Sequence, residues 1–336
     1  MEMSMAQQGA DSMKGKRVLV TGGLGFIGSN LALGCLRAGA EVSIYDVLDP
    51  RGGGNLYNIH AIRDSVEVVI NDVRNFEAVC AALVRKDVLF NCAAFTSHPN
   101  SMKEPLIDID VNCKGVINLL EAARRFNPDV KIVHVGTSTQ IGRMRYSPVD
   151  ENHPEFPVDI YSANKSASEK YVLIYGGAYR MRATVVRFAN VFGPRSNIRT
   201  PEFGFMNYFI GLGLQGKDLT VFGDGAQLRN VSYVEDCVSA LILAALSDRS
   251  DREPFFAVSD RQCSVAEIAD RISRHVGGKV RYVEWPKDRE AIEIGDAVIS
   301  NGKIRSVLGW APQHDLEEGL VKTREYFHPV LKEYLR

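Results

Sequence analysis

The 336-residue sequence lacks an excess of either charge. It carries 40 Lys and Arg residues against 41 Asp and Glu residues, which gives a formal net charge of −1. Proteins that bind nucleic acids or anionic membranes usually present a strongly basic field or patch. We therefore expect neither a nucleic acid nor a membrane surface as a partner.

Long apolar runs and paired cysteines are also scarce. A helix needs about 20 apolar residues to cross a bilayer, and no run in the sequence approaches that length. The six cysteines show no spacing typical of a metal site. Cys35, Cys80, Cys92 and Cys113 lie in apolar stretches, which is typical of reduced thiols in a core. We therefore expect no metal and a cytoplasmic location.

Strand-like and helix-like runs alternate through the first half of the chain. The predicted strands are Arg17–Thr21, Val42–Tyr45, Val66–Ile70, Val88–Asn91, Lys131–Val135 and Thr184–Phe188. The predicted helices are Gly25–Ala38, Asn75–Val84, Pro105–Phe126 and Ser162–Ala178. This alternation predicts an α/β fold with a Rossmann-like, doubly wound parallel sheet.

The pattern loosens after Phe188. Helical patterns cover Val231–Leu246 and Ser264–Val276, and strand-like runs cover Pro254–Val258 and Lys279–Val283. We predict a disordered, methionine-rich head at residues 1–15 and a Rossmann domain at 16–191 and 230–260. A smaller, discontinuous C-terminal cap would occupy residues 192–229 and 261–336. Trp310 is expected in the core of that cap.

A strand, a glycine-rich turn and a helix follow one another near the start of the predicted Rossmann domain. The turn holds Gly22, Gly25 and Gly28. Glycines let the backbone approach a phosphate, and a helix N-terminus offers free N–H groups and a positive dipole end. The spacing differs from the common G-x-G-x-x-G, so the glycines alone could also mark an ordinary tight turn.

Two acidic residues strengthen the phosphate interpretation. Asp46 ends the second predicted strand, close to the interval of about 20 residues at which a carboxylate binds a ribose 2′-hydroxyl. A carboxylate there repels a 2′-phosphate and favours NAD over NADP, although Arg51 could approach such a phosphate. Asp72 follows the third strand, where it could face an adenine or simply belong to a turn.

Tyr161 and Lys165 form a candidate proton-transfer pair. Their spacing places both side chains on one face of a helix. A free tyrosine has a pKa of about 10, and a cation held nearby lowers it. The pair could therefore move a proton at neutral pH beside a hydride acceptor.

Together these segments resemble the extended short-chain dehydrogenase/reductase superfamily, and within it the NAD-dependent nucleotide-sugar epimerases and dehydratases. The resemblance rests on segments spread over most of the chain: Thr21–Gly28, Asp46, Asp72-Val73, Asn91–Ala94, Asn112 with Gly115, Thr137–Thr139, Tyr161–Lys165, Arg187–Arg195 and Arg229–Asp236. It implies NAD as the cofactor, a nucleotide-diphosphate sugar as the substrate, and a homodimer formed through the helix that ends at Phe126 and the Tyr161 helix.

The resemblance also assigns roles to individual residues. The implied NAD-binding residues are Gly22, Gly25, Phe26, Ile27, Asp46, Asp72, Val73, Ala93, Ala94, Asn112, Tyr161 and Lys165. The implied substrate-binding residues are Thr96, Ser138, Thr139, Asn190, Phe222, Arg229 and Arg289. Phe222 would pack on the base and Arg229 would hold the diphosphate, with Arg289 as a second phosphate ligand. A lone arginine could equally form a surface salt bridge.

The strand end at residues 137–139 separates the chemistries of the family. One hydroxyl there would hydrogen-bond the reacting sugar hydroxyl; spacing to Gly142 selects Thr137, with Ser138 and Thr139 as alternatives. Dehydratases of the family carry Asp-Glu directly after this hydroxyl. Here Ser138 and Thr139 occupy those places, and hydroxyls do not act as general acids near neutral pH.

The sequence therefore predicts an NAD-dependent nucleotide-sugar epimerase with Thr137, Tyr161 and Lys165 as catalytic residues. It would invert C4 of an NDP-hexose or NDP-hexuronate through a transient 4-keto sugar. The alternatives are a 2-epimerase, a dehydratase or a reductase on the same scaffold, or a non-catalytic nucleotide-sugar-binding protein. His98 could serve as a further acid or base, or be an ordinary loop histidine.

Overall fold

The computed structural model describes residues 12–290 and 293–335. The backbone of the short helix α10 (Lys287–Glu290) is included in this description. The side chains of Asp288 and Arg289 lie outside the described part, and so does most of the predicted head. The predicted contact of Arg289 with a phosphate therefore stays a prediction.

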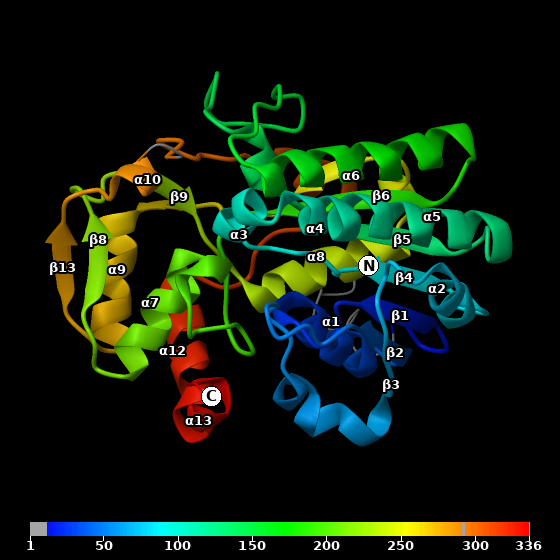
Figure 1. The fold of residues 1–336 in the computed structure, drawn as a ribbon, viewed down its shortest axis with the longest axis horizontal. Coiled ribbons are helices and arrows are strands. Elements are labelled where there is room, and N and C mark those ends of the chain that lie inside the picture. Colours follow the sequence, from blue (N-terminus) through cyan, green and yellow to red (C-terminus); the bar gives the residue numbers. More distant parts are fainter. Residues whose placement is uncertain (1–11, 291–292, 336) are drawn as a thin grey trace, which may run out of the picture.

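Seven parallel strands form the central sheet (Figure 1). They are β1 (Arg17–Thr21), β2 (Glu41–Asp46), β3 (Glu67–Ile70), β4 (Val88–Asn91), β5 (Lys131–Thr137), β6 (Ala183–Phe188) and β11 (Pro254–Phe256). Their order is β11-β6-β5-β4-β1-β2-β3, and each neighbouring pair is parallel. The strand order reverses between β1 and β4, so the doubly wound prediction is confirmed.

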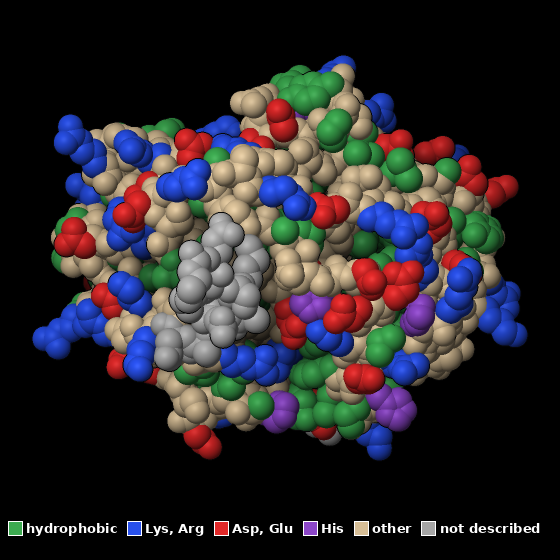
Figure 2. All heavy atoms as spheres, turned by 180° about the vertical axis from the view of Figure 1, so that it is seen from behind, with side chains coloured by type: hydrophobic (Ala, Val, Ile, Leu, Met, Phe, Trp, Pro, Cys, Tyr) green, Lys and Arg blue, Asp and Glu red, His purple; other side chains and the backbone are tan. Residues whose placement is uncertain are grey.

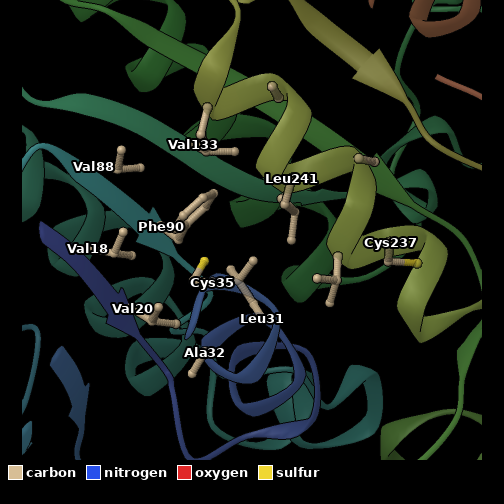
Figure 3. Close-up of a cluster of buried hydrophobic side chains, with 14 of the residues drawn as sticks. Val18, Val20, Leu31, Ala32, Cys35, Val88, Phe90, Val133, Cys237 and Leu241 are labelled. Carbon is tan, nitrogen blue, oxygen red and sulfur yellow. The ribbon is translucent and has the colours of Figure 1, made fainter. Parts of the chain in front are cut away.

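Two helical layers cover the two faces of the sheet because its strands alternate their buried side chains. Val18 and Val20 of β1 face the layer of α1 (Phe26–Arg37), α8 (Val234–Leu246) and α11 (Gly302–Leu308). Leu19 faces the layer of α2 (Phe76–Leu83), α5 (Gly115–Phe126) and α6 (Ile160–Ala178). Figure 3 shows Leu31 and Leu241, from α1 and α8, meeting the strand residues of the first layer.

Three local predictions need correction. The predicted helix Pro105–Phe126 is divided into α4 (Pro105–Ile109), a π-helical turn at Asp110–Lys114 and α5. Residues predicted as a loop form α3 (His98–Lys103), which Ser97 caps by accepting the backbone N–H of Asn100. The helix predicted from Val231 begins only at Val234, because Ser232–Tyr233 forms β10 beside β7 (Val191–Phe192).

The predicted domain boundaries shift at two places. The disordered head is wrong for residues 12–15, because they form a turn in which Met13 is fully buried in the first core layer. Trp310 packs in that same layer, with its indole N–H donating to Ser239 of α8 at 2.9 Å. Residues 302–310 therefore return to the Rossmann side instead of the cap.

The cap has a separate apolar core. It contains α7 (Phe205–Leu214), α9 (Val265–His275), α12 (Leu316–Phe327) and the parallel pair β8 (Leu219–Phe222) and β13 (Val280–Val283). A second pair, β9 (Leu228–Asn230) and β12 (Gln262–Ser264), is antiparallel. Each pair joins segments from the two parts of the cap, and Figure 1 shows these elements to one side of the main sheet.

The surface carries both signs of charge. On the face seen in Figure 2, Lys and Arg side chains alternate with Asp and Glu side chains over the described residues. This mixture matches the near-zero net charge of the sequence. Among the described residues, no helix is long and apolar enough to cross a membrane.

Candidate active site

A cleft of about 370 Å³ lies at the carboxyl ends of the central strands, where open α/β sheets bind ligands. It gathers most of the predicted site residues: Gly22, Gly25, Phe26, Ile27, Asp46, Asp72, Val73, Ala93, Ala94, Thr96, Thr137, Thr139, Tyr161, Lys165 and Asn190. Asn112, Ser138, Phe222 and Arg229 do not line it. The cleft therefore unites all the predicted cofactor residues except Asn112, but only part of the predicted substrate residues.

The glycine turn forms the floor of one end of the cleft. Gly22 has φ +68°, and a Cβ added there would lie 2.7 Å from the backbone nitrogen of Ala93. A Cβ on Gly28 would lie 2.2 Å from the carbonyl oxygen of Gly22. The first turn of α1 follows Gly25 without a side-chain cap, so its N–H groups stay available. This turn fits the diphosphate of a dinucleotide.

Asp46 braces the glycine turn and faces the cleft. One carboxylate oxygen accepts the backbone N–H of Leu24 at 2.9 Å, and the other accepts the N–H of Leu48 at 2.8 Å. Burial raises the pKa of Asp46, although both hydrogen bonds oppose the shift. Each oxygen keeps a further lone pair, so the carboxylate fits the acceptor that a ribose diol needs.

Two arginines at this end of the cleft are paired with neighbouring acids. Arg51 lies 2.7 Å from Asp49, and Arg74 lies 2.5 Å from Asp72. The charge of the Arg51 guanidinium is therefore partly neutralised, which makes Arg51 less suited to bind a ribose 2′-phosphate. The Asp72 carboxylate is likewise engaged, although the residue lines the cleft.

Tyr161 and Lys165 lie on α6 and line the cleft, but the pKa of Tyr161 shifts in the opposite direction to the one that the sequence predicts. Burial raises the pKa of Tyr161, and the carboxylates of Asp108 and Asp159 raise it further. Burial lowers the pKa of Lys165 to about 8. Burial and the two carboxylates therefore outweigh any lowering of the Tyr161 pKa by Lys165, and activation of the phenol by Lys165 stays a prediction.

The Lys165 amine is held from behind by β5. It donates to the carbonyl oxygen of Val135 at 2.7 Å and lies 3.1 Å from Nε2 of His134. Burial lowers the pKa of His134 well below its usual value, so that this imidazole is neutral. No spacing in the sequence predicts this contact, because His134 lies within an otherwise apolar strand.

Thr137 occupies the position expected of the catalytic hydroxyl. It hydrogen-bonds Tyr161, and its Oγ1 lies 3.1 Å from Oγ1 of Thr139. Oγ1 of Thr139 in turn lies 2.9 Å from the hydroxyl oxygen of Ser162. Ser138 lies outside the lining of the cleft. The geometry therefore favours Thr137 among the three hydroxyls.

Asn112 supports the site without lining it. Its amide donates to the carbonyl of Phe95 at 2.9 Å and accepts the N–H of Phe95 at 3.0 Å. It also donates to Asp108 at 2.9 Å. These bonds engage both ends of a residue that is 1% exposed, so Asn112 supports the loop at Phe95, and its direct contact with the cofactor stays a prediction.

The predicted substrate residues of the cap are tied to other cap residues. Arg229 forms an ion pair with Glu293 at 2.8 Å and donates to the carbonyl of Gly295. The Phe222 ring lies 5.4 Å from that of Trp285. Both side chains would have to exchange these contacts for a nucleotide, so their substrate roles stay predictions.

The sequence matches the NAD dependent epimerase/dehydratase family over residues 18–256. A putative UDP-glucose 4-epimerase of Methanocaldococcus jannaschii is 33% identical over 90% of this chain and 95% of its own. A CDP-paratose 2-epimerase of Salmonella typhi is 25% identical over 92% of this chain and 98% of its own. Relatives with different reactions therefore align over nearly the whole chain.

Solved structures agree with this family. Epimerase Mth375 of Methanothermobacter thermautotrophicus has a TM-score of 0.90 at 27% identity, covering 99% of this chain and 98% of its own. A Thermotoga maritima UDP-glucose 4-epimerase with UDP-glucose has a TM-score of 0.84 at 29% identity, covering 94% and 99%. A Thermus thermophilus UDP-glucose 4-epimerase in complex with NAD has a TM-score of 0.83 at 29% identity, covering 94% and 99%.

Proposed function

Because the chain belongs to the NAD dependent epimerase/dehydratase family, we propose that it is a nucleotide-sugar epimerase. It inverts C4 of an NDP-hexose or NDP-hexuronate through a transient 4-keto sugar. The observation that carries the proposal is the placement of Thr137 and Tyr161 in the cleft, with Ser138 and Thr139 in place of acidic residues directly after Thr137. The acidic residues lining the described cleft are Asp46, Asp49, Asp72 and Glu202.

Those four acids belong to other parts of the cleft. Asp46 ends β2, Asp72 follows β3, and Asp49 pairs with Arg51. Glu202 lies on a cap turn and accepts the hydroxyl of Thr200 at 2.9 Å. A dehydratase needs a general acid at the sugar to expel water. The hydroxyl groups present favour reversible oxidation of one carbon instead.

The chain's own residues would divide the work as follows. Tyr161 takes the proton of the sugar 4-hydroxyl, and Thr137 orients that hydroxyl through its bond to the phenol. When bound, NAD⁺ supplies the hydride acceptor and a positive ring that favours the phenolate. Lys165, which is buried against Val135, would help to hold the nicotinamide ribose. Tyr161 returns the proton after the sugar has turned over in the cleft.

The test is turnover without added cofactor. We expect the purified protein to interconvert C4 epimers from a panel of UDP-, GDP-, CDP- and dTDP-sugars with no added NAD(H), followed by NMR of the sugar. Tyr161→Phe should lower the rate by about 10²- to 10⁴-fold, since it removes the acid/base. Inversion at C2, loss of water or consumption of added NADH would each replace the C4 assignment by the matching alternative.

We also propose a cytoplasmic homodimer. Apolar side chains remain exposed on α4 and α6, with Leu106 at 75%, Ile109 at 39% and Ile174 at 58% exposure. Covering such side chains is favourable in proportion to their apolar area. Sedimentation equilibrium of the protein would reveal a monomer if this proposal is wrong.

A further inference from the structure

His98 and Asp159 form a hydrogen-bonded pair in the wall of the cleft. Nδ1 of His98 lies 2.8 Å from Oδ2 of Asp159. The ring of His98 meets that of Tyr161 edge to face, with centroids 4.9 Å apart. The His98 side chain is 34% exposed and lines the cleft, whereas the Asp159 side chain is 5% exposed. The pair thus has one buried end and one end open to a ligand.

Asp159 caps α6 and also contacts the imidazole of His98. Its Oδ1 accepts the backbone N–H of Ser162 at 2.8 Å, as an N-cap requires. Its Oδ2 accepts the Ser162 hydroxyl at 3.0 Å and also faces the imidazole. Burial acts to raise the pKa of Asp159, but the bonds from His98 and Ser162 outweigh it and hold the pKa below its usual value.

An ionised Asp159 determines which nitrogen of His98 faces the ligand. The carboxylate accepts a hydrogen bond, so it fixes the proton of a neutral imidazole on Nδ1. The lone pair of Nε2 is then left free. Within the described residues Nε2 has no hydrogen-bond partner, and the ring borders the cleft.

Ser101 holds the imidazole and the phenol in a fixed relation. Its hydroxyl donates to the carbonyl of His98 at 2.8 Å and accepts the backbone N–H of Tyr161 at 3.0 Å. The first turns of α3 and α6 are therefore joined beside the cleft. Fixed geometry of this kind favours a proton transfer, because no reorganisation is needed before it.

The proposed C4 inversion gives His98 no task. Tyr161 and Thr137 already handle the hydroxyl proton, while a carboxylate-held imidazole is a second general base next to them. Once C4 is a carbonyl, the hydrogens on C3 and C5 become acidic, because the resulting carbanion is delocalised onto the carbonyl oxygen. A base beside Tyr161 would face one of these carbons.

Resting on the proposed function, we infer that His98 is a second catalytic residue that exchanges a proton with a sugar carbon next to the transient carbonyl. The C–H bond breaks and its proton goes to Nε2 of His98. The electron pair forms the C=C bond of an enolate, whose oxygen accepts hydrogen bonds from the Tyr161 and Thr137 hydroxyls. Return of the proton restores the 4-keto sugar, and no oxidant is needed. A single base serves one face, so the exchange proceeds with retention.

The test starts from a carbonyl that is already in place. NAD-loaded protein is incubated in D₂O with UDP- or dTDP-4-keto-6-deoxyglucose, and deuterium at C3 and C5 is followed by NMR. We expect wash-in at one of the two carbons, with retention and well above the rate in buffer. His98→Gln should lower that rate by about 10²-fold or more, as removal of a general base does.

Two variants separate base catalysis from structural damage. Asp159→Asn keeps an N-cap but removes the charge that fixes the imidazole, so the exchange should slow by about 10-fold or more. His60→Gln changes an exposed histidine that stacks on Tyr57 away from the cleft. It should exchange as fast as the parent protein. Thermal melting of each variant checks that it is folded.

The outcomes distinguish this inference from the proposed function. Wash-in no faster than in buffer, or equal wash-in by His98→Gln, overturns the role of His98 even if C4 inversion of UDP-glucose proceeds. Wash-in that depends on His98, without inversion of any nucleotide sugar, upholds the role of His98 and removes the C4 assignment instead.

Discussion

The Rossmann half and the cap use their motif residues differently. In the Rossmann half, the glycine turn, Asp46, Thr137 and Tyr161 meet in one cleft. In the cap, Arg229 is paired with Glu293, and Phe222 packs on Trp285. A parallel sheet brings the ends of distant strands to one edge. The cap has only the two-stranded parallel pair β8 and β13, and its predicted substrate residues make side-chain contacts that a ligand would have to replace.

The largest expected effect is the loss of NAD binding by the Rossmann half. In Gly28→Ala the three atoms nearest to the added Cβ would be backbone atoms of the glycine turn, with the Gly22 oxygen at 2.2 Å. Overpacking of this kind costs about 1–3 kcal/mol and shifts the backbone. We expect the variant to purify with little NAD, measured by absorbance after denaturation, and with almost no epimerase activity.

The matched control for that variant is Gly177→Ala. Gly177 lies on α6, the helix that carries Tyr161, and a Cβ there would meet nothing within 4 Å. Alanine stabilises an exposed helix position by about 0.5–1 kcal/mol relative to glycine. The control should retain NAD and melt at an equal or slightly higher temperature; a loss of NAD in both variants would contradict the close approach at Gly28.

The next effect concerns stability and the contact between the cap and α8 of the Rossmann half. His314, just before α12, lies 2.9 Å from Asp236 and 3.2 Å from Glu235 of α8. These carboxylates raise its pKa to about 9 from 6.5, against the effect of burial. The stabilisation is fully present below about pH 6.5 and is lost as pH rises through about 9.

We expect His314→Gln to lower the free energy of unfolding by on the order of 2 kcal/mol at pH 6, and much less at pH 10. Urea unfolding at both pH values measures the difference. His328→Gln, an exposed histidine after α12, should change neither value. An equal loss at both pH values would mean that packing, and not charge, joins the cap to α8.

The smallest expected effect concerns substrate binding by the cap. If Arg229 leaves Glu293 to hold the substrate diphosphate, Arg229→Ala should raise KM about 10-fold, because a charged hydrogen bond contributes about 1.5–3 kcal/mol. Steady-state kinetics with the best nucleotide sugar would show this with kcat little changed. In Glu293→Gln the arginine is released, so KM should stay equal or fall. Equal loss of thermal stability in both variants, with KM unchanged, would make the ion pair purely structural.

Sequence reasoning succeeded where a short segment determines its own structure. The run from Arg17 to Gly28 becomes a strand, a turn and a helix because buried β-branched residues lead into glycines that the turn requires. Asp46 falls at the end of its strand for the same local reason. The sequence-based predictions were wrong where the conformation of the backbone depends on contacts with distant parts of the chain. This is the case at β10, which pairs with β7, and at Met13, which is buried in the core beside the sheet.

Local spacing and strand order were enough to predict the fold class, NAD as the cofactor, and the place of Tyr161 and Lys165 on one helix. The pKa values of these two residues depend on the packed molecule. Burial and two carboxylates raise the pKa of Tyr161, and the protein interior leaves Lys165 against Val135 and His134. The tertiary structure also brings His98 and Asp159 together, although they are far apart in the chain. Desolvation and contact across long sequence separations depend on the packed molecule, so no spacing in the sequence could reveal them.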